Sequence, residues 1–358
     1  MEKVALTVLT GNISDKNSEL INGFEALAIA DVLRNVFSVD VLTCKTCSNC
    51  ITVDETFDIN AYDKFFIVNG ALNMYGGNEI ETATIIYKLI GKFRGKIYYI
   101  LTDFSMPLIE YYSFIKGKEW SKKYKDDNFK FNNDVTILSQ FNNSEAVIKN
   151  HKNIPIKEVI YMPWASWKLE LLDEIQPIKK VNKQYDLIYG GSFRSGRRAK
   201  KMLEYFFNRK NINVAMFGSI KLDQFSKYKY DCAPNFIKKV PVEKVVELNN
   251  SSIATLIIGD NSYNNTTITL RVWESLLSDA IVFIDNDFDP QHNILKEDWY
   301  YVSSGDELES KILELKENSE LYLDKKLEQN NILQEYIDKK ELTNKLKDIF
   351  KGDRDNEL

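Results

Sequence analysis

Three arginines and three glycines stand close together in the stretch YGGSFRSGRR at positions 189–198. The preceding run YDLIYGG is typical of a buried strand and the following AKKMLEYFF has helical spacing, so the arginines fall on a strand-to-helix turn. We expect the helix to begin near Ser195, where unpaired N–H groups and the helix dipole attract anions and disfavour cations. Arg194, Arg197 and Arg198 oppose that field unless they close around a bound anion, which the glycines let approach the backbone. The stretch matches neither GxGxxG nor GxxxxGK[ST], but it favours phosphate binding over the alternative, solvated surface charge.

A second candidate group lies in the stretch IIGDNSYNNTTITLRVWESLLSDA. Arg271 and Glu274 are three residues apart on the expected helix, after a polar loop that follows a strand. The arginine can reach a phosphate, and a carboxylate can accept hydrogen bonds from both hydroxyls of a ribose. For this pair alone, an internal Arg–Glu helix pair is an equal alternative. Taken with the arginine turn, the pair predicts a nucleoside diphosphate site in the second half of the chain.

The cysteines and the net charge argue against two other kinds of site. Cys44, Cys47 and Cys50 have CxxCxxC spacing, but zinc and iron–sulfur sites need about four ligands, and the chain has only two histidines. We therefore prefer a loop of free thiols. The net charge of −5 argues against a uniformly basic nucleic-acid-binding surface, although a local patch such as the lysine-rich segment 115–130 is compatible with it.

Two series of alternating strands and helices position these residues. The expected strands are VALTVLTG, VDVLTC, KFFIVNG, KIYYILTD and VTILSQF, then YDLIYGG, NVAMFGS, IATLIIGD and AIVFIDN. Helical stretches between them indicate βαβ units and parallel sheets. A segment with Pro and Trp near 161–184 separates the halves, and the tail from 305 predicts amphipathic helices. The fold class is therefore α/β, with two doubly wound, Rossmann-like domains and ligands expected at the carboxyl ends of the strands.

The sequence gives no sign of a membrane or export signal. No apolar run approaches the roughly 18–20 residues that span a bilayer. The start, MEKVALTVLTGN, has an acidic second residue and is typical of a buried strand rather than a signal peptide. We expect a cytoplasmic, monomeric protein without a membrane partner.

The motifs YGGSFRSGRR, TLRVWESLLSDA and FIDNDFD resemble the DNA β-glucosyltransferases of T-even bacteriophages, and VNGALNMYGG and KIYYILTDFSMP are similar to that family's first half. The resemblance covers nearly the whole chain and is weakest at 41–60, 105–160 and beyond 305. It implies the GT-B architecture, with two Rossmann-like domains facing across a cleft and C-terminal helices packing back on the first. It implies a first domain of residues 1–165 completed by a helix at about 335–358, and a second of residues 166–334.

The same resemblance implies an activity and its residues. The family transfers glucose from UDP-glucose to the hydroxyl of 5-hydroxymethylcytosine in double-stranded DNA, with inversion, which for a phage protein means in the host cytoplasm. Asp103, after the strand KIYYILT, matches the general base, and Glu25 matches its partner glutamate; for Asp103 the alternative is a helix N-cap. The residues expected to bind the donor are Gly191, Ser192, Arg194, Arg198, Phe217, Val240, Asp260, Tyr263, Arg271 and Glu274.

The DNA-binding expectations rest on one loop and one lysine-rich segment. The loop at 73–77 matches the family's base-flipping loop, with Asn73, Tyr75 and Gly76 as candidates to displace the target base; a plain turn is the alternative. Lys116, Lys118 and Lys122 are candidates for phosphate contacts, with a solvated surface as the alternative.

One departure concerns a metal. Ala165 stands where the family carries an acidic residue associated with a divalent cation, and alanine cannot ligate one. The need for Mg²⁺ or Mn²⁺, and the identity of the sugar, therefore stay open.

Three alternatives remain. The enzyme could use another sugar or another hydroxymethylated base, it could be a DNA-binding relative without activity, or it could be a GT-B enzyme for small acceptors. The presence of Asp103, Glu25 and the arginines speaks against an inactive relative, and the 73–77 loop speaks weakly against small acceptors.

Overall fold

The chain forms two compact units in a computed structural model. The first comprises Met1–Trp167 and Lys339–Leu358, and the second Lys168–Asp338. The sequence predicts boundaries after residues 165 and 334, and the observed ones follow residues 167 and 338. The residues that the structure describes are 2–7, 29–30, 32–43, 50–54, 56–68, 85, 88–101, 133–139, 144–151, 155–162, 183–240, 244–259, 270–336 and 339–351.

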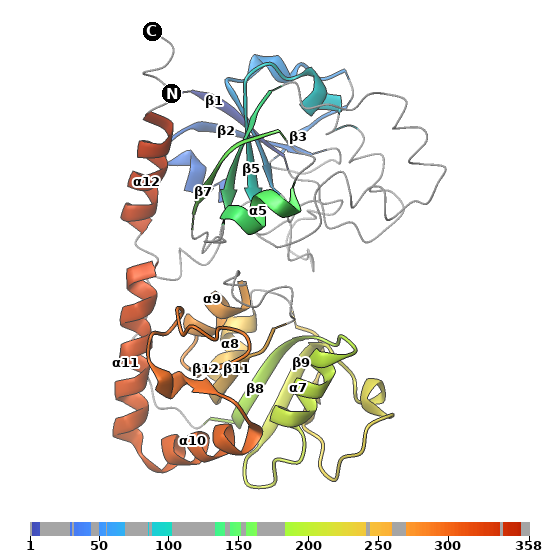
Figure 1. The fold of residues 1–358 in the computed structure, drawn as a ribbon, viewed down its shortest axis with the longest axis vertical. Helices are drawn as coiled ribbons and strands as arrows, with labels where there is room; N and C mark the ends of the chain where they lie inside the picture. Colours follow the sequence, from blue (N-terminus) through green and yellow to red (C-terminus); the bar gives the residue numbers. More distant parts are fainter. Residues whose placement is uncertain are drawn as a thin grey trace. The chain divides into compact units, whose positions relative to one another are not determined.

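The first unit is built on a seven-stranded sheet (Figure 1). Its strands are β1 (Lys3–Thr7), β2 (Ser38–Thr43), β3 (Ile51–Thr52), β4 (Lys64–Val68), β5 (Lys96–Leu101), β6 (Val135–Ser139) and β7 (Ile156–Tyr161). All pairs are parallel, in the order β3-β2-β1-β4-β5-β6-β7. Strands β4 and β6 are buried along their whole length, as a parallel sheet covered on both faces requires. Before β7, the helical elements with described bounds are η1 (Ile59–Ala61) and α5 (Ser144–Asn150), and residues 29–30, 32–34 and 88–92 are also helical.

Helix α12 (Lys339–Lys351) returns from the far end of the sequence to the first unit. Its Phe350 is buried and makes edge-on contacts with Phe37, Phe66 and Tyr98, at ring-centroid distances of 4.8, 5.8 and 5.0 Å. This confirms the expected packing of a C-terminal helix on the first domain.

The second unit holds a six-stranded parallel sheet, ordered β10-β9-β8-β11-β12-β13. Numbered in chain order within the unit, the strands run 3-2-1-4-5-6, which is the doubly wound arrangement. The order reverses between β8 and β11, the point beside which such folds bind ligands. The strands are β8 (Tyr185–Ser192), β9 (Val214–Ser219), β10 (Asn235–Ile237), β11 (Ser252–Ile257), β12 (Ile281–Asp285) and β13 (Tyr301–Val302).

Helices follow the strands of this second sheet (Figure 1). They are α7 (Arg197–Phe206), α8 (Val245–Asn250), α9 (Leu270–Leu276), α10 (Gly305–Glu317) and α11 (Ser319–Tyr336), with short turns η4 (Leu222–Phe225) and η6 (Asp298–Tyr300). No helix in the described ranges is both long enough and apolar enough to traverse a lipid bilayer.

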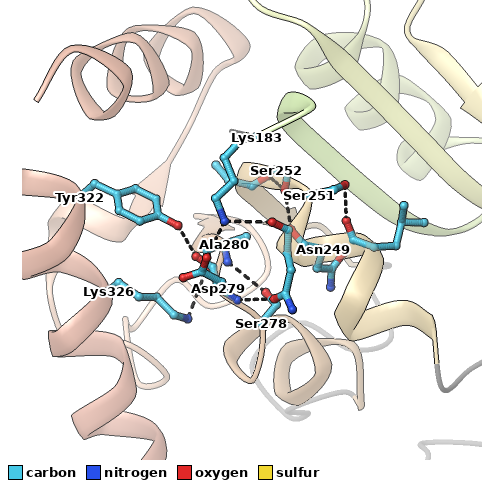
Figure 2. Close-up of polar contacts among 12 residues, drawn as sticks. Lys183, Asn249, Ser251, Ser252, Ser278, Asp279, Ala280, Tyr322 and Lys326 are labelled. Carbon is cyan, nitrogen blue, oxygen red and sulfur yellow. Dashed lines mark hydrogen bonds and ion pairs between the residues drawn. The ribbon is translucent and has the colours of Figure 1, made fainter. Parts of the chain in front are cut away.

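Helix α11 is tied to the amino end of this sheet by buried polar contacts (Figure 2). Lys326 is 2% exposed and donates hydrogen bonds to the carbonyl oxygens of Leu276 and Ala280 at 3.0 and 3.3 Å. Tyr322 donates to the carbonyl of Asp279, whose carboxylate pairs with Lys183 at 2.6 Å. Burial lowers the pKa of Lys326 to about 7, with Asp279 raising it and Lys183 lowering it further.

Candidate functional site

The carboxyl ends of β8 and β9 lie so close together that glycines are needed where they pair. Gly190 pairs with Phe217 and Gly191 with Gly218. A methyl group on Gly190 would lie 2.3 Å from the Phe217 ring, and one on Gly218, whose φ is +108°, would lie 2.1 Å from the carbonyl oxygen of Gly191. Gly190, which the sequence assigned to ligand approach, is therefore needed first for the close approach of β9, whereas a methyl group on Gly191 would lie 2.8 Å from the Tyr189 hydroxyl oxygen.

The three arginines of this turn do not act alike. Helix α7 begins at Arg197, two residues later than expected, behind Gly196 with φ +82°. Arg197 reaches away to Asp287, at 2.6 Å, in a half-exposed pair. Arg198 donates from Nη2 to the hydroxyl of Tyr189 at 2.8 Å, and Arg194 is exposed. Arg197 is thus engaged by a carboxylate from another element.

Part of the positive charge at the start of α7 is balanced within the chain. Lys201, one turn after Arg197, lies 2.9 Å from Asp285 and 2.7 Å from Asp287, both at the carboxyl end of β12. Hydrogen bonds from Lys201, and then from Arg197, lower the pKa of Asp287. Burial lowers the pKa of Lys201, but its bonds to Asp287 and Asp285 outweigh this and raise it. Asp285 is 2% exposed and also accepts from Tyr205 at 2.9 Å.

Arg271 and Glu274 lie together on α9, the helix that follows β11. Arg271 Nη1 is 2.8 Å from Glu274 Oε2, and the carboxylate is nearly fully buried. The Arg271 guanidinium carbon stands 5.8 Å from the centre of the Phe217 ring. The structure therefore forms the internal helix pair that the sequence left open, and the pair holds Arg271 over Phe217 and next to the β8–β9 strand ends.

The remaining predicted residues fall in two groups. Phe217 is buried and belongs to the core of the second unit, and Val240 packs at the edge of the same cluster. Neither has a described contact that tests a role in donor binding. The residues outside the described ranges are Glu25, Asn73, Tyr75, Gly76, Asp103, Lys116, Lys118, Lys122, Ala165, Asp260 and Tyr263. Asp103 follows the end of β5 by two residues, so its catalytic role stays a prediction.

Comparison with known proteins decides the family. A family model described as bacteriophage T4 beta-glucosyltransferase matches residues 3–168. The DNA beta-glucosyltransferase of Enterobacteria phage T4 is 33% identical over 323 residues, covering 89% of this chain and 91% of the relative. The chain belongs to the T4 beta-glucosyltransferase family. It is therefore a glycosyltransferase.

Solved structures of the T4 beta-glucosyltransferase family match this chain along 97% of its length. A crystal structure of the T4 phage enzyme in complex with its UDP-glucose substrate superposes with a TM-score of 0.79 at 31% identity, covering 97% of this chain and 98% of that one. Another, of the T4 enzyme with UDP and Mn²⁺, gives a TM-score of 0.81 at 31% identity, with 97% and 99% covered. These matches confirm the two-domain GT-B fold.

The described residues of this family member contain no metal-binding cluster. No group of three or more His, Cys, Asp or Glu side chains comes together among them. Cys50 is half-buried and forms no disulfide, while Cys44 and Cys47 lie outside the described ranges, so the loop of thiols at 44–50 stays a prediction.

Sequence reasoning missed the residues that organise the start of α7. Tyr189, Lys201, Asp285 and Asp287 were not selected, although FIDNDFD places acids directly after a strand. Because parallel strands end at one edge of the sheet, those acids lie beside the basic start of RRAKKMLEYF. Pairing an acidic strand end with a basic helix start was the signal that could have identified them.

Proposed function

We propose that this protein transfers glucose from UDP-glucose to the hydroxyl of 5-hydroxymethylcytosine in double-stranded DNA, acting in the host cytoplasm. The observation that carries the proposal is the 33% identity to the T4 DNA beta-glucosyltransferase across 89% of the chain. The T4 enzyme with its UDP-glucose substrate, which matches this chain along 97% of its length, supports UDP-glucose as the donor.

The donor's diphosphate would bind at the carboxyl edge of the second sheet. Helices α7 and α9 both begin at this edge, next to the reversal of strand order between β8 and β11. We assign Arg194, Arg198 and Arg271 to the phosphates, because guanidinium groups bind phosphate oxygens through charge-assisted hydrogen bonds. We assign Glu274 to the ribose hydroxyls. Its carboxylate is paired with Arg271, so it would have to accept hydrogen bonds from the ribose and from Arg271 at the same time.

The transfer step needs a base and a stabilised leaving group. Asp103, with Glu25 as its partner, takes the proton of the hydroxymethyl group as its oxygen bonds to the anomeric carbon. The bond between that carbon and the UDP oxygen breaks, and its electron pair leaves with UDP. The arginines stabilise the negative charge that develops on the diphosphate. Attack from the face opposite UDP inverts the anomeric configuration.

The acceptor must leave the DNA stack before it can react. A base inside the duplex cannot reach the donor sugar, and its extrusion costs a few kcal/mol. We assign Asn73, Tyr75 and Gly76 to the loop that fills the gap, and Lys116, Lys118 and Lys122 to the DNA backbone, where binding falls with salt.

The proposed step uses side chains of the chain and does not involve a divalent cation. The described residues offer no cluster of donors for one, and Ala165 cannot ligate a cation. The T4 enzyme with UDP and Mn²⁺ shows that a relative accepts the ion.

The test is a transfer assay with two duplexes that differ only in carrying 5-hydroxymethylcytosine or cytosine. Each duplex is incubated with UDP-glucose, UDP-galactose or UDP-N-acetylglucosamine, and the mass of the DNA is then measured by mass spectrometry. We expect one hexose to be added from UDP-glucose, on the hydroxymethylated duplex alone. Another sugar in the product would correct the donor, and UDP-glucose consumption that ignores DNA would indicate a small acceptor.

Two variants separate catalysis from donor binding. Asp103→Asn should lower the transfer rate about 10²–10⁴-fold with UDP affinity unchanged. Arg194→Ala should weaken UDP-glucose binding more than DNA binding. No transfer from any donor by the wild type would refute the proposed function, and equal losses of the two affinities in Arg194→Ala would refute the donor site.

A further inference from the structure

We propose that Tyr189 is a positioning residue that holds Arg198 ready for the diphosphate of the donor. The inference rests on the proposed function for the identity of the ligand. Its basis is the hydrogen bond from Arg198 Nη2 to the Tyr189 hydroxyl, at 2.8 Å.

Tyr189 is itself firmly held. It lies on β8, is 2% exposed, and its ring packs on Phe206 of α7 with centroids 4.8 Å apart. A methyl group built on Gly191 would come within 2.8 Å of the Tyr189 hydroxyl oxygen, so that oxygen sits directly against the β8 strand end. The position of the hydroxyl is therefore fixed, and its hydrogen bond fixes the orientation of the Arg198 side chain on α7.

The chemistry of the contact suits an arginine that must bind an anion. Arginine has only donors, so the Tyr189 oxygen accepts the hydrogen bond from the Arg198 guanidinium. A neutral hydroxyl orients the guanidinium without cancelling its charge. Asp287 does the opposite at Arg197, since its carboxylate compensates the charge of the guanidinium.

Preorganisation gives Tyr189 a measurable effect on affinity. A mobile arginine side chain loses rotamer freedom when it is ordered, and this entropy loss opposes binding. Ordering it before the ligand arrives removes that loss from the binding step. Without the hydroxyl, the affinity for the diphosphate should fall while the groups that react stay in place.

The test compares Tyr189→Phe with Tyr300→Phe, a control of the same kind in the same unit. The Tyr300 hydroxyl is also hydrogen-bonded, to the Lys325 carbonyl and the Glu328 carboxylate, but it lies on η6. Calorimetric titration with UDP alone should show roughly tenfold weaker binding for Tyr189→Phe and unchanged binding for Tyr300→Phe. In transfer assays, Tyr189→Phe should raise KM for UDP-glucose by a similar factor and leave kcat within about twofold.

A double-mutant cycle shows whether Tyr189 acts through Arg198. In an Arg198→Ala background, Tyr189→Phe should change the UDP affinity less than twofold. Equal UDP binding by wild type and Tyr189→Phe, or equal losses with and without Arg198, would overturn the inference while the proposed function stands. A wild type that does not bind UDP would overturn both.

Discussion

Gly218→Ala tests how tightly the two strand ends beneath the candidate donor site are packed. The new methyl group meets two obstacles. Gly218 has φ +108°, a conformation that costs an L-residue about 1–3 kcal/mol, and the methyl carbon would lie 2.1 Å from the Gly191 carbonyl oxygen, where ordinary contact begins at 3.4 Å. The obstacle is backbone in a paired strand and cannot rotate away, so we add about 1–3 kcal/mol for overpacking.

The expected loss of unfolding free energy is therefore about 4 kcal/mol, of which roughly half comes from each source. Gly196→Ala isolates the first source, because Gly196 has φ +82° but no atom within 4 Å of the added methyl group. It should cost about 2 kcal/mol.

Urea unfolding followed by circular dichroism measures both variants, and amide hydrogen exchange on β8 and β9 assigns the loss to the second unit. Gly218→Ala should also weaken UDP binding, since the Gly191 carbonyl has to move. Equal losses of unfolding free energy in the two variants would show that β8 and β9 move apart at no energetic cost. That result would refute the packing argument.

Three further outcomes follow from the buried contacts. Because the pKa of Lys326 is about 7 when folded and 10.5 at its ordinary value, unfolding takes up protons between those pH values, so stability should rise by about 1.4 kcal/mol per pH unit there. Urea midpoints at pH 7.5 and 9 should show this rise in the wild type and a smaller one in Lys326→Met; identical slopes would contradict it. Lys201→Met, which leaves Asp285 buried without its cation, should cost about 3 kcal/mol, against less than about 1 for the exposed Arg197→Ala, and equal urea-unfolding losses would argue against the network. Phe350→Ala should cost about 3–5 kcal/mol and lower hydrogen-exchange protection in the first unit alone; unchanged protection there would mean that α12 is dispensable.

The strands were predictable where the signal was local. Each long apolar run in the sequence became a strand of a parallel sheet, since burial on both faces needs an apolar run. Four strands were missed: β3, β10 and β13 have only two or three residues, and β7 is a partly exposed edge strand that carries Lys157 and Glu158.

The candidate site was predictable in composition more than in geometry. Local charge indicated an anion site at the arginine turn. The sequence near Arg197 does not predict its ion pair with Asp287, which is 90 residues away. The glycine requirement has the same origin, because Gly218 is restricted by Gly191 of another strand. Contacts between distant segments decide which charges stay available, and no local pattern contains them.

The return of α12 has a consequence for how the protein is made. The second unit is inserted within the first, so the ribosome must synthesise Lys168–Asp338 before it reaches the helix that covers Phe37, Phe66 and Tyr98. At about 5–20 residues per second, that interval is on the order of 10–30 seconds. Until α12 has been made, the aromatic surface of the first sheet lacks its cover, whereas the second unit has all its described strands once Val302 has been added. The unit translated first should therefore be the last to complete its core.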